Sequence, residues 1–143
     1  MQKDIAVGHL IIPTAAVRDE GTSYHYVKPA REICACERAV IAIEDALTRR
    51  GTPYIKAKTW TTDAFYRETP AKLLRRISEG CVTVDMEASA YMAVSQYLGV
   101  EFGQIFYAGD NLSGAEWDSR GWNSQSAIRE NVLRIALDAC IAM

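Results

Sequence analysis

Two acid-bearing segments contain the residues of this chain that are best suited to chemistry. In the first segment, Asp85 and Glu87 follow the apolar run 81–84. In the second, Asp110 follows the apolar run 102–108. Each run has the composition of a buried strand, and open α/β sheets bind their ligands just beyond the carboxyl ends of the strands. Two strand ends that carry carboxylates therefore predict a site that binds hydroxyl groups and moves a proton.

The segment formed by Asp85, Met86 and Glu87 has two interpretations. Acidic residues are frequent in the first turn of a helix, where they complement the helix dipole. Alternatively, the Met86 thioether packs against a sugar ring while a carboxylate accepts hydrogen bonds from two vicinal hydroxyls. Asp110, which follows Gly109, either caps a turn through its own backbone or acts as a general acid whose pKa is raised in a partly dry pocket. The sequence pattern leaves both choices open.

Aromatic residues lie near both segments. Phe65 and Tyr66 are in a loop that follows the β-rich stretch 54–62. An aromatic side chain in such a loop either stacks on a planar base or packs at the rim of the core. The polar stretch after the second segment contains Trp117, Arg120 and Trp122. This group forms either a flap over the site, with Arg120 paired to an acid, or an interface patch, because Trp and Arg are enriched at interfaces.

The composition argues against several classes of protein. The net charge of -2 lacks the basic excess of a nucleic-acid binder. No apolar run approaches the roughly 18 residues of a membrane-spanning helix, and the first residues lack a signal-peptide pattern, so we expect a cytoplasmic protein without a membrane partner. The two histidines and four cysteines have no metal-site spacing, and there is no P-loop or GxGxxG motif. We therefore expect neither a metal nor a cofactor.

Apolar patterning predicts strands that alternate with helices, and hence an α/β fold with a mixed, mostly parallel sheet flanked by helices. The 143 residues suit one domain. The expected strands are residues 7–17, 54–62, 81–84 and 102–108. The expected helices are residues 33–50, 71–79, 87–98 and 124–141. Pro13 is expected to interrupt the first strand, and the run 81–84 to be a central parallel strand. The residues expected to share one face of the second strand are Ile55, Ala57, Thr59 and Thr61.

Four segments of the chain, in order, resemble the nucleoside phosphorylase family, which includes hexameric purine nucleoside phosphorylases and uridine phosphorylase. Residues 8–23 (GHLIIPTAAVRDEGTS) resemble a strand and loop from the middle of the family's chain. Residues 62–66 (TDAFY) resemble its base-stacking segment, and residues 84–88 (VDMEA) its ribose-binding signature. Residues 109–111 (GDN) resemble the segment with its purine-protonating acid. Each segment is moderately specific, and the four in this order are strongly specific.

The resemblance implies a phosphorylase/hydrolase-like fold and a role for each matching residue. Phe65 would stack on the base, Met86 would line the ribose, and Glu87 would bind its 2′- and 3′-hydroxyls. Asp110 would protonate N7 of a purine, or donate a hydrogen bond to it. The implied reaction is phosphorolytic cleavage of a nucleoside to free base and ribose 1-phosphate, with inorganic phosphate as co-substrate. Uridine phosphorylases generally lack this acid and read uracil with a Gln and an Arg that residues 67–71 do not provide at the expected offsets, which favours a purine or a broader substrate.

The chain also departs from the family. Its members are longer, and the 143 residues resemble their C-terminal part, so the fold is expected to be N-terminally truncated. The family's Gly-rich turn and phosphate-binding arginines would lie in the missing front, and His9 replaces a usual acid. Three hypotheses follow: a phosphorylase that is impaired as this chain alone, a non-catalytic nucleoside-binding module, or a structural subunit. The family builds its sites at dimer interfaces, so we expect a homo-oligomer that involves Tyr24, His25 and Tyr26, and that needs a separate N-terminal segment for activity.

Overall fold

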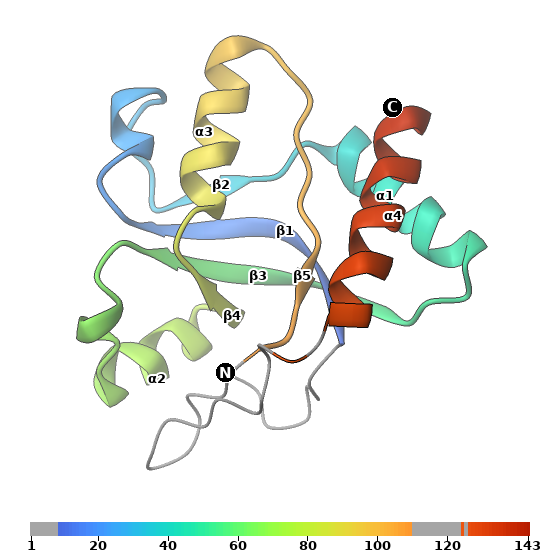
Figure 1. Ribbon diagram of the computed structural model, residues 1–143. Coiled ribbons are helices and arrows are strands. Elements are labelled where there is room, and N and C mark those ends of the chain that lie inside the picture. Colours follow the sequence, from blue (N-terminus) through green and yellow to red (C-terminus); the bar gives the residue numbers. More distant parts are fainter. Residues whose placement is uncertain (1–8, 110–123, 125) are drawn as a thin grey trace.

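A mixed, five-stranded sheet forms the centre of the protein in the computed structural model, which describes residues 9–109, 124 and 126–143. The strands are β1 (Leu10–Asp19), β2 (Glu32–Cys34), β3 (Tyr54–Thr62), β4 (Cys81–Asp85) and β5 (Phe106–Tyr107). β1, β3 and β4 are parallel neighbours, whereas β2 and β5 pair antiparallel with β1 (Figure 1). The predicted α/β class, with its mixed, mostly parallel sheet, is confirmed.

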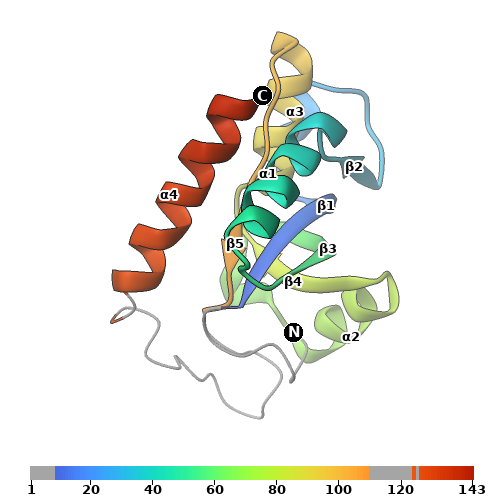
Figure 2. The same cartoon turned by 90° about the vertical axis from the view of Figure 1, so that its right-hand side faces the viewer.

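Helices cover both faces of this sheet. They are α1 (Glu37–Arg49), α2 (Pro70–Ser78), α3 (Ala88–Leu98) and α4 (Ser126–Ala142), and the 3-10 turns are η1 (Ser23–His25) and η2 (Phe65–Arg67). α1 and α4 pack on Leu10 and Ile12 of β1, α2 packs on Val17 and Trp60, and α3 packs on Ala16. Figure 2 shows α4 at the left of the view and α2 at its lower right. The ends of α2 and α3 agree with the prediction, because Gly80 and Gly99 adopt φ values of 87° and 66° that favour glycine.

The side chains of β1 alternate between the two faces of the sheet and contribute apolar groups to the core on each face. Leu10 and Ile12 pack with α1 and α4 through Ala42, Ile43, Ala46, Leu47, Ile135 and Ala139. Beyond the extra residue Thr14, Ala16 lies on the other face, with Ile11, and packs against α3 through Ala88, Met92 and Ala93. Val17 lies on the face of Leu10 and Ile12 and packs with Trp60, Cys81 and Leu73 of α2. The side-chain period of two along a strand explains how one strand contributes to cores on both sides.

The start of the chain differs from the expected pattern in two places. β1 continues through Pro13, and its pairing with β3 shifts register between Pro13 and Ala15 instead of breaking. Proline lacks an N–H to donate, so a local irregularity lets the strand keep pairing on either side. Ile33, which was expected in the next helix, belongs to the short edge strand β2, and α1 begins only at Glu37 after Cys36. Ile33 fits the helical spacing, but its burial comes from pairing with Ala16.

The faces of β3 agree with the prediction that Ile55, Ala57, Thr59 and Thr61 share one face. β3 has no extra residue in its pairing with either neighbour, because the residues that the register skips are Thr14 of β1 and Val82 of β4. Thr59 and Thr61 both donate hydrogen bonds to Asp85, whereas Trp60 packs with Leu73 of α2 on the opposite face. The extra residue in β4 places Cys81 on the Trp60 face and Asp85 on the threonine face.

The positions of β4 and β5 also correct the prediction. β4 was expected to be central, but it is the last strand of the path β2-β1-β3-β4 in the part of the chain that the structure describes. β5 is shorter than the predicted strand 102–108 and runs antiparallel to β1, with Tyr107 opposite Leu10. Its carboxyl end therefore lies at the amino end of β1, about 25 Å along an extended strand from the end at which β3 and β4 finish.

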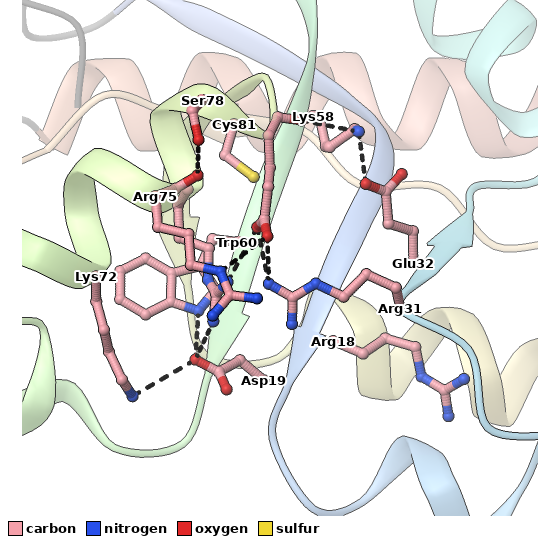
Figure 3. A network of polar contacts seen from close by, with 12 residues as sticks. Arg18, Asp19, Arg31, Glu32, Lys58, Trp60, Lys72, Arg75, Ser78 and Cys81 are labelled. Atoms are coloured by element: carbon pink, nitrogen blue, oxygen red, sulfur yellow. Dashed lines mark hydrogen bonds and ion pairs between the residues drawn. The ribbon is translucent and has the colours of Figure 1, made fainter.

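An ion network around the buried Arg76 side chain fastens α2 to the sheet (Figure 3). Asp19 Oδ2, at the end of β1, accepts hydrogen bonds from Trp60 Nε1 at 3.0 Å and Arg76 Nη2 at 2.9 Å. The Arg76 guanidinium is 4% exposed, lies over the Trp60 ring and also donates to Glu79 at 3.0 Å. Because the buried Arg76 charge is paired and hydrogen-bonded, α2 is held in one place against β1 and β3.

Candidate functional site

Phe65, Met86 and Glu87 lie at the same end of the sheet, as the sequence predicted for a ligand site. Thr61 of β3 is the register partner of Asp85 of β4, so residues just beyond each strand emerge side by side. Phe65 is 48% exposed and Met86 is 40% exposed. Glu87 precedes α3 and is exposed. The exposed trio therefore offers an apolar surface and a carboxylate to solvent.

Asp85 fixes the backbone of this segment. Its Oδ1 atom accepts hydrogen bonds from the backbone N–H groups of Glu87 at 2.9 Å and Ala88 at 2.7 Å. Its Oδ2 atom accepts from Thr59 Oγ1 at 2.6 Å, and Thr61 Oγ1 donates to the same carboxylate at 3.2 Å. Burial raises the pKa of Asp85, and these hydrogen bonds oppose that shift. Asp85 is thus the acid that caps the helix.

The two interpretations of this segment apply to different residues. Asp85 is the acid that caps the helix, and Glu87 is the acid that is available to bind a sugar. The backbone of Glu87 is held by Asp85, while its own side chain is exposed at the start of α3. A carboxylate that is exposed on a fixed backbone can accept hydrogen bonds from two neighbouring hydroxyls without much loss of conformational freedom. Met86 lies between them with its side chain exposed.

The aromatic part of the site is the turn η2. The rings of Phe65 and Tyr66 are 4.0 Å apart between centroids and inclined by 40°. The loop that leads to η2 is anchored by Asp63, whose Oδ2 accepts the backbone N–H of Gly21 at 2.9 Å. Phe65 is half-buried and Tyr66 is 88% exposed, so Phe65 is the better-fixed ring for stacking.

A buried acid that the sequence reasoning did not single out connects this site to the rest of the fold. Glu20 is 7% exposed and follows β1 directly. Its Oε1 accepts from Ser89 Oγ at 2.7 Å, and its Oε2 accepts from the Ser23 N–H at 2.9 Å. Arg18, which is 2% exposed, donates from Nε to Ser23 Oγ at 2.8 Å and stacks on Tyr24 with 4.2 Å to the ring centroid. The available signal was an acid directly after a long apolar strand.

Several predicted site residues lie outside the described part of the chain. They are Asp110, Trp117, Arg120 and Trp122. Their roles as purine-side acid and as flap or interface therefore stay predictions. The expectation that both acid-ended strands finish at one edge of the sheet is wrong for β5, because this strand runs antiparallel to β1.

Other features of the described residues do not add to this site. An apolar groove between α1, residues 101–105 and α4 includes Phe102, Gly103 and Cys140, and it contains none of the candidate residues. No group of three or more His, Cys, Asp and Glu side chains is placed to hold a metal ion within residues 9–109, 124 and 126–143. Among the helices in this same part of the chain, none has the length and hydropathy needed to cross a bilayer.

Comparison with known proteins identifies the family. The sequence model described as the phosphorylase superfamily matches residues 1–142. The chain belongs to this superfamily. Its curated relatives include a guanosine phosphorylase of Halorubrum lacusprofundi, 24% identical over 148 residues that cover 100% of this chain and 61% of the relative. A uridine phosphorylase of Thermococcus kodakarensis is 39% identical over 66 residues, which cover 46% of this chain and 24% of the relative.

Solved structures of the superfamily share the fold. Purine nucleoside phosphorylase from Toxoplasma gondii, in complex with immucillin-H, matches 96% of this chain and 57% of its own with a TM-score of 0.81 and 24% identity. AMP nucleosidase from Bacteroides thetaiotaomicron matches 99% of this chain and 55% of its own with a TM-score of 0.77 and 23% identity. The predicted phosphorylase-type fold is confirmed, and the chain spans little more than half the length of these relatives.

The hydrogen bonds of Glu20 lead to a pH-dependent prediction. Burial alone would raise the pKa of Glu20, but hydrogen bonds with Ser23 and Ser89 lower the pKa below its ordinary value of 4.5. A lowered pKa in the folded state gives stability that is present above pH 4.5 and is lost as the pH falls through the folded pKa. We expect the wild type to exceed Glu20→Gln in free energy of unfolding near neutral pH, and this difference to shrink on acidification.

Urea denaturation of both proteins across the acidic range measures this difference. Asp85 titrates in both proteins, so its own shift cancels in the comparison. Glu130→Gln, which changes an exposed acid of α4, is the control and is expected to lower the free energy of unfolding near neutral pH less than Glu20→Gln does. A difference that grows as the pH falls would contradict the assignment.

Proposed function

We propose that this chain carries the ribose- and base-binding part of a nucleoside phosphorylase, and that its substrate is a purine nucleoside. The observation that carries the proposal is the exposed Met86–Glu87 pair on a backbone that Asp85 fixes, beside the half-exposed Phe65. Membership of the superfamily supports a nucleoside as the ligand. In this proposal Met86 lines the ribose, Glu87 accepts hydrogen bonds from its 2′- and 3′-hydroxyls, and Phe65 stacks on the base.

The proposed reaction is phosphorolysis of the N-glycosidic bond. A phosphate oxygen forms a bond to C1′, the bond from C1′ to the base nitrogen breaks, and its electron pair passes to the base. Positive charge develops on the ribose and negative charge on the base, so a carboxylate at the hydroxyls and an acid at N7 stabilise both. We assign the role at the hydroxyls to Glu87. The resemblance gives the role at N7 to Asp110, which would have to approach Glu87 from β5, a strand that finishes at the opposite end of β1.

Activity of the chain by itself is a separate matter, because phosphorolysis also requires phosphate to be held against C1′. The chain spans 61% of the guanosine phosphorylase that it matches. The alternative function is therefore a non-catalytic nucleoside-binding or structural subunit of the same fold. Nucleoside affinity that does not depend on phosphate favours the binding module, and the following experiments separate these cases.

Removing the Glu87 carboxylate tests the ribose contact. Glu87→Ala is expected to weaken inosine binding about 10- to 100-fold, because hydrogen bonds from two hydroxyls to a carboxylate are lost. Isothermal titration calorimetry without phosphate measures the dissociation constant. Glu130→Ala, at an exposed acid on α4, should leave the affinity unchanged. Equal affinities of Glu87→Ala and wild type would exclude Glu87 from the site.

The two adjacent rings of η2 allow a matched test of base stacking. Phe65→Ala is expected to weaken inosine binding about tenfold, because base–aromatic stacking is lost. Tyr66→Ala, at a ring that is 88% exposed, is expected to change it little. Quenching of intrinsic fluorescence on titration with inosine reports both. A larger loss for Tyr66→Ala than for Phe65→Ala would assign the stacking ring to Tyr66 instead.

Turnover tests whether this chain is sufficient for the reaction. We expect little or no release of hypoxanthine from inosine and phosphate by the purified 143-residue chain, because the family's phosphate-binding residues have no match in it. Release is measured by a coupled xanthine oxidase assay. Robust phosphate-dependent turnover that disappears in Asp110→Ala would contradict the expected impairment and would support the role of Asp110.

A further inference from the structure

The dipeptide Glu20–Gly21, at the end of β1, touches both parts of the candidate nucleoside site. The Glu20 carboxylate accepts a hydrogen bond from Ser89 Oγ at 2.7 Å, in the first turn of α3. The Gly21 N–H donates to Asp63 Oδ2 at 2.9 Å, just before η2. One short segment therefore connects the helix that follows Glu87 with the turn that contains the stacking aromatics.

Ser89 links Glu20 to the ribose side of the site. Its backbone N–H donates to Thr61 Oγ1 at 3.0 Å, and the same threonine hydroxyl donates to Asp85 at 3.2 Å. Asp85 in turn accepts the backbone N–H of Glu87 at 2.9 Å. A displacement of Ser89 is therefore transmitted through two hydrogen-bonded side chains to the backbone of Glu87.

Glu20 is itself held in a fixed position. Ser89 and Ser23 are fully buried, and Glu20 is 7% exposed. The Ser23 N–H occupies the second carboxylate oxygen of Glu20, and the buried Arg18 guanidinium donates to the Ser23 hydroxyl. Buried polar groups that satisfy one another in this way form rigid networks.

We propose that Glu20 is a positioning residue for nucleoside binding, which acts through Ser89 on Glu87 and through Gly21 on the stacking turn η2. The proposal rests on the function proposed above, because it is the nucleoside that occupies the positioned groups. Glu20 itself touches no substrate. Its effect on affinity passes through the exposed residues, and this distinguishes it from an acid that contributes only to stability.

Two serines of α3 allow a matched test. Ser89→Ala breaks the link to Glu20 and is expected to weaken inosine binding about tenfold in the calorimetric assay. Ser95→Ala is the control, because Ser95 is also buried but its hydroxyl donates only within the helix, to the Met92 carbonyl at 2.9 Å. Equal affinities of the two variants would overturn the proposal.

A double mutant separates positioning from general destabilisation. If Ser89 acts through Glu87, Ser89→Ala has no further effect on affinity in a Glu87→Ala background. A loss that adds in full to that of Glu87→Ala would show that Ser89 acts by another route and would overturn the proposal.

Amide hydrogen exchange of the free protein tests the positioning role independently of nucleoside binding. Amide hydrogen exchange at Glu87 and Ala88 should be faster in Ser89→Ala than in Ser95→Ala, because these are the amides that Asp85 holds. If the wild type binds no nucleoside, the proposed function fails, and the exchange rates still decide whether Glu20 and Ser89 fix this backbone. Equal exchange in the two variants would overturn the positioning role.

Discussion

Polar side chains that are buried at the carboxyl ends of β1, β3 and β4 must find hydrogen-bond partners there, and this requirement organises the candidate site. Asp85 receives four donors, from two threonine side chains and two backbone amides. Glu20 receives donors from α3 and from the turn after β1. Each carboxylate draws its donors from more than one element. The exposed groups proposed to bind the nucleoside are therefore positioned by carboxylates that do not contact the nucleoside themselves.

The local part of this arrangement could be predicted from the sequence. A strand that ends in Asp85, Met86 and Glu87 predicts both a helix start and exposed groups beyond the strand. The two readings of that segment, helix-capping acid and binding acid, both hold, but for different residues. Asp85 caps α3 and is partly buried, whereas Glu87 leaves its carboxylate in solvent. Composition alone does not assign the two acids, because the assignment depends on which side chain faces β3.

The non-local part could not be predicted, for reasons of geometry. Glu20 and Ser89 are separated by 69 positions in the chain, and no local pattern marks their contact. β2 was hidden because Ile33 also fits the helical spacing of α1. The direction of β5 depends on pairing with Leu10 and Ile11, almost a hundred residues earlier, and not on its own apolar composition. The confirmed fold followed from the alternation of strands and helices, which is a property of neighbouring residues.

The regular alternation of β3 has a consequence for how the site tolerates change in evolution. Trp60 faces α2 while Thr59 and Thr61 face Asp85, and the extra residue Val82 belongs to the neighbouring strand β4. Loss or gain of a single residue in the second half of β3 would exchange the two sets, placing an indole against α3 and hydroxyls against α2. Point substitutions along β3 can be accommodated one at a time, but changes of length there are expected to be inherited only together with a compensating change nearby. The length of the last part of β3 is therefore more constrained than the identity of most of its residues.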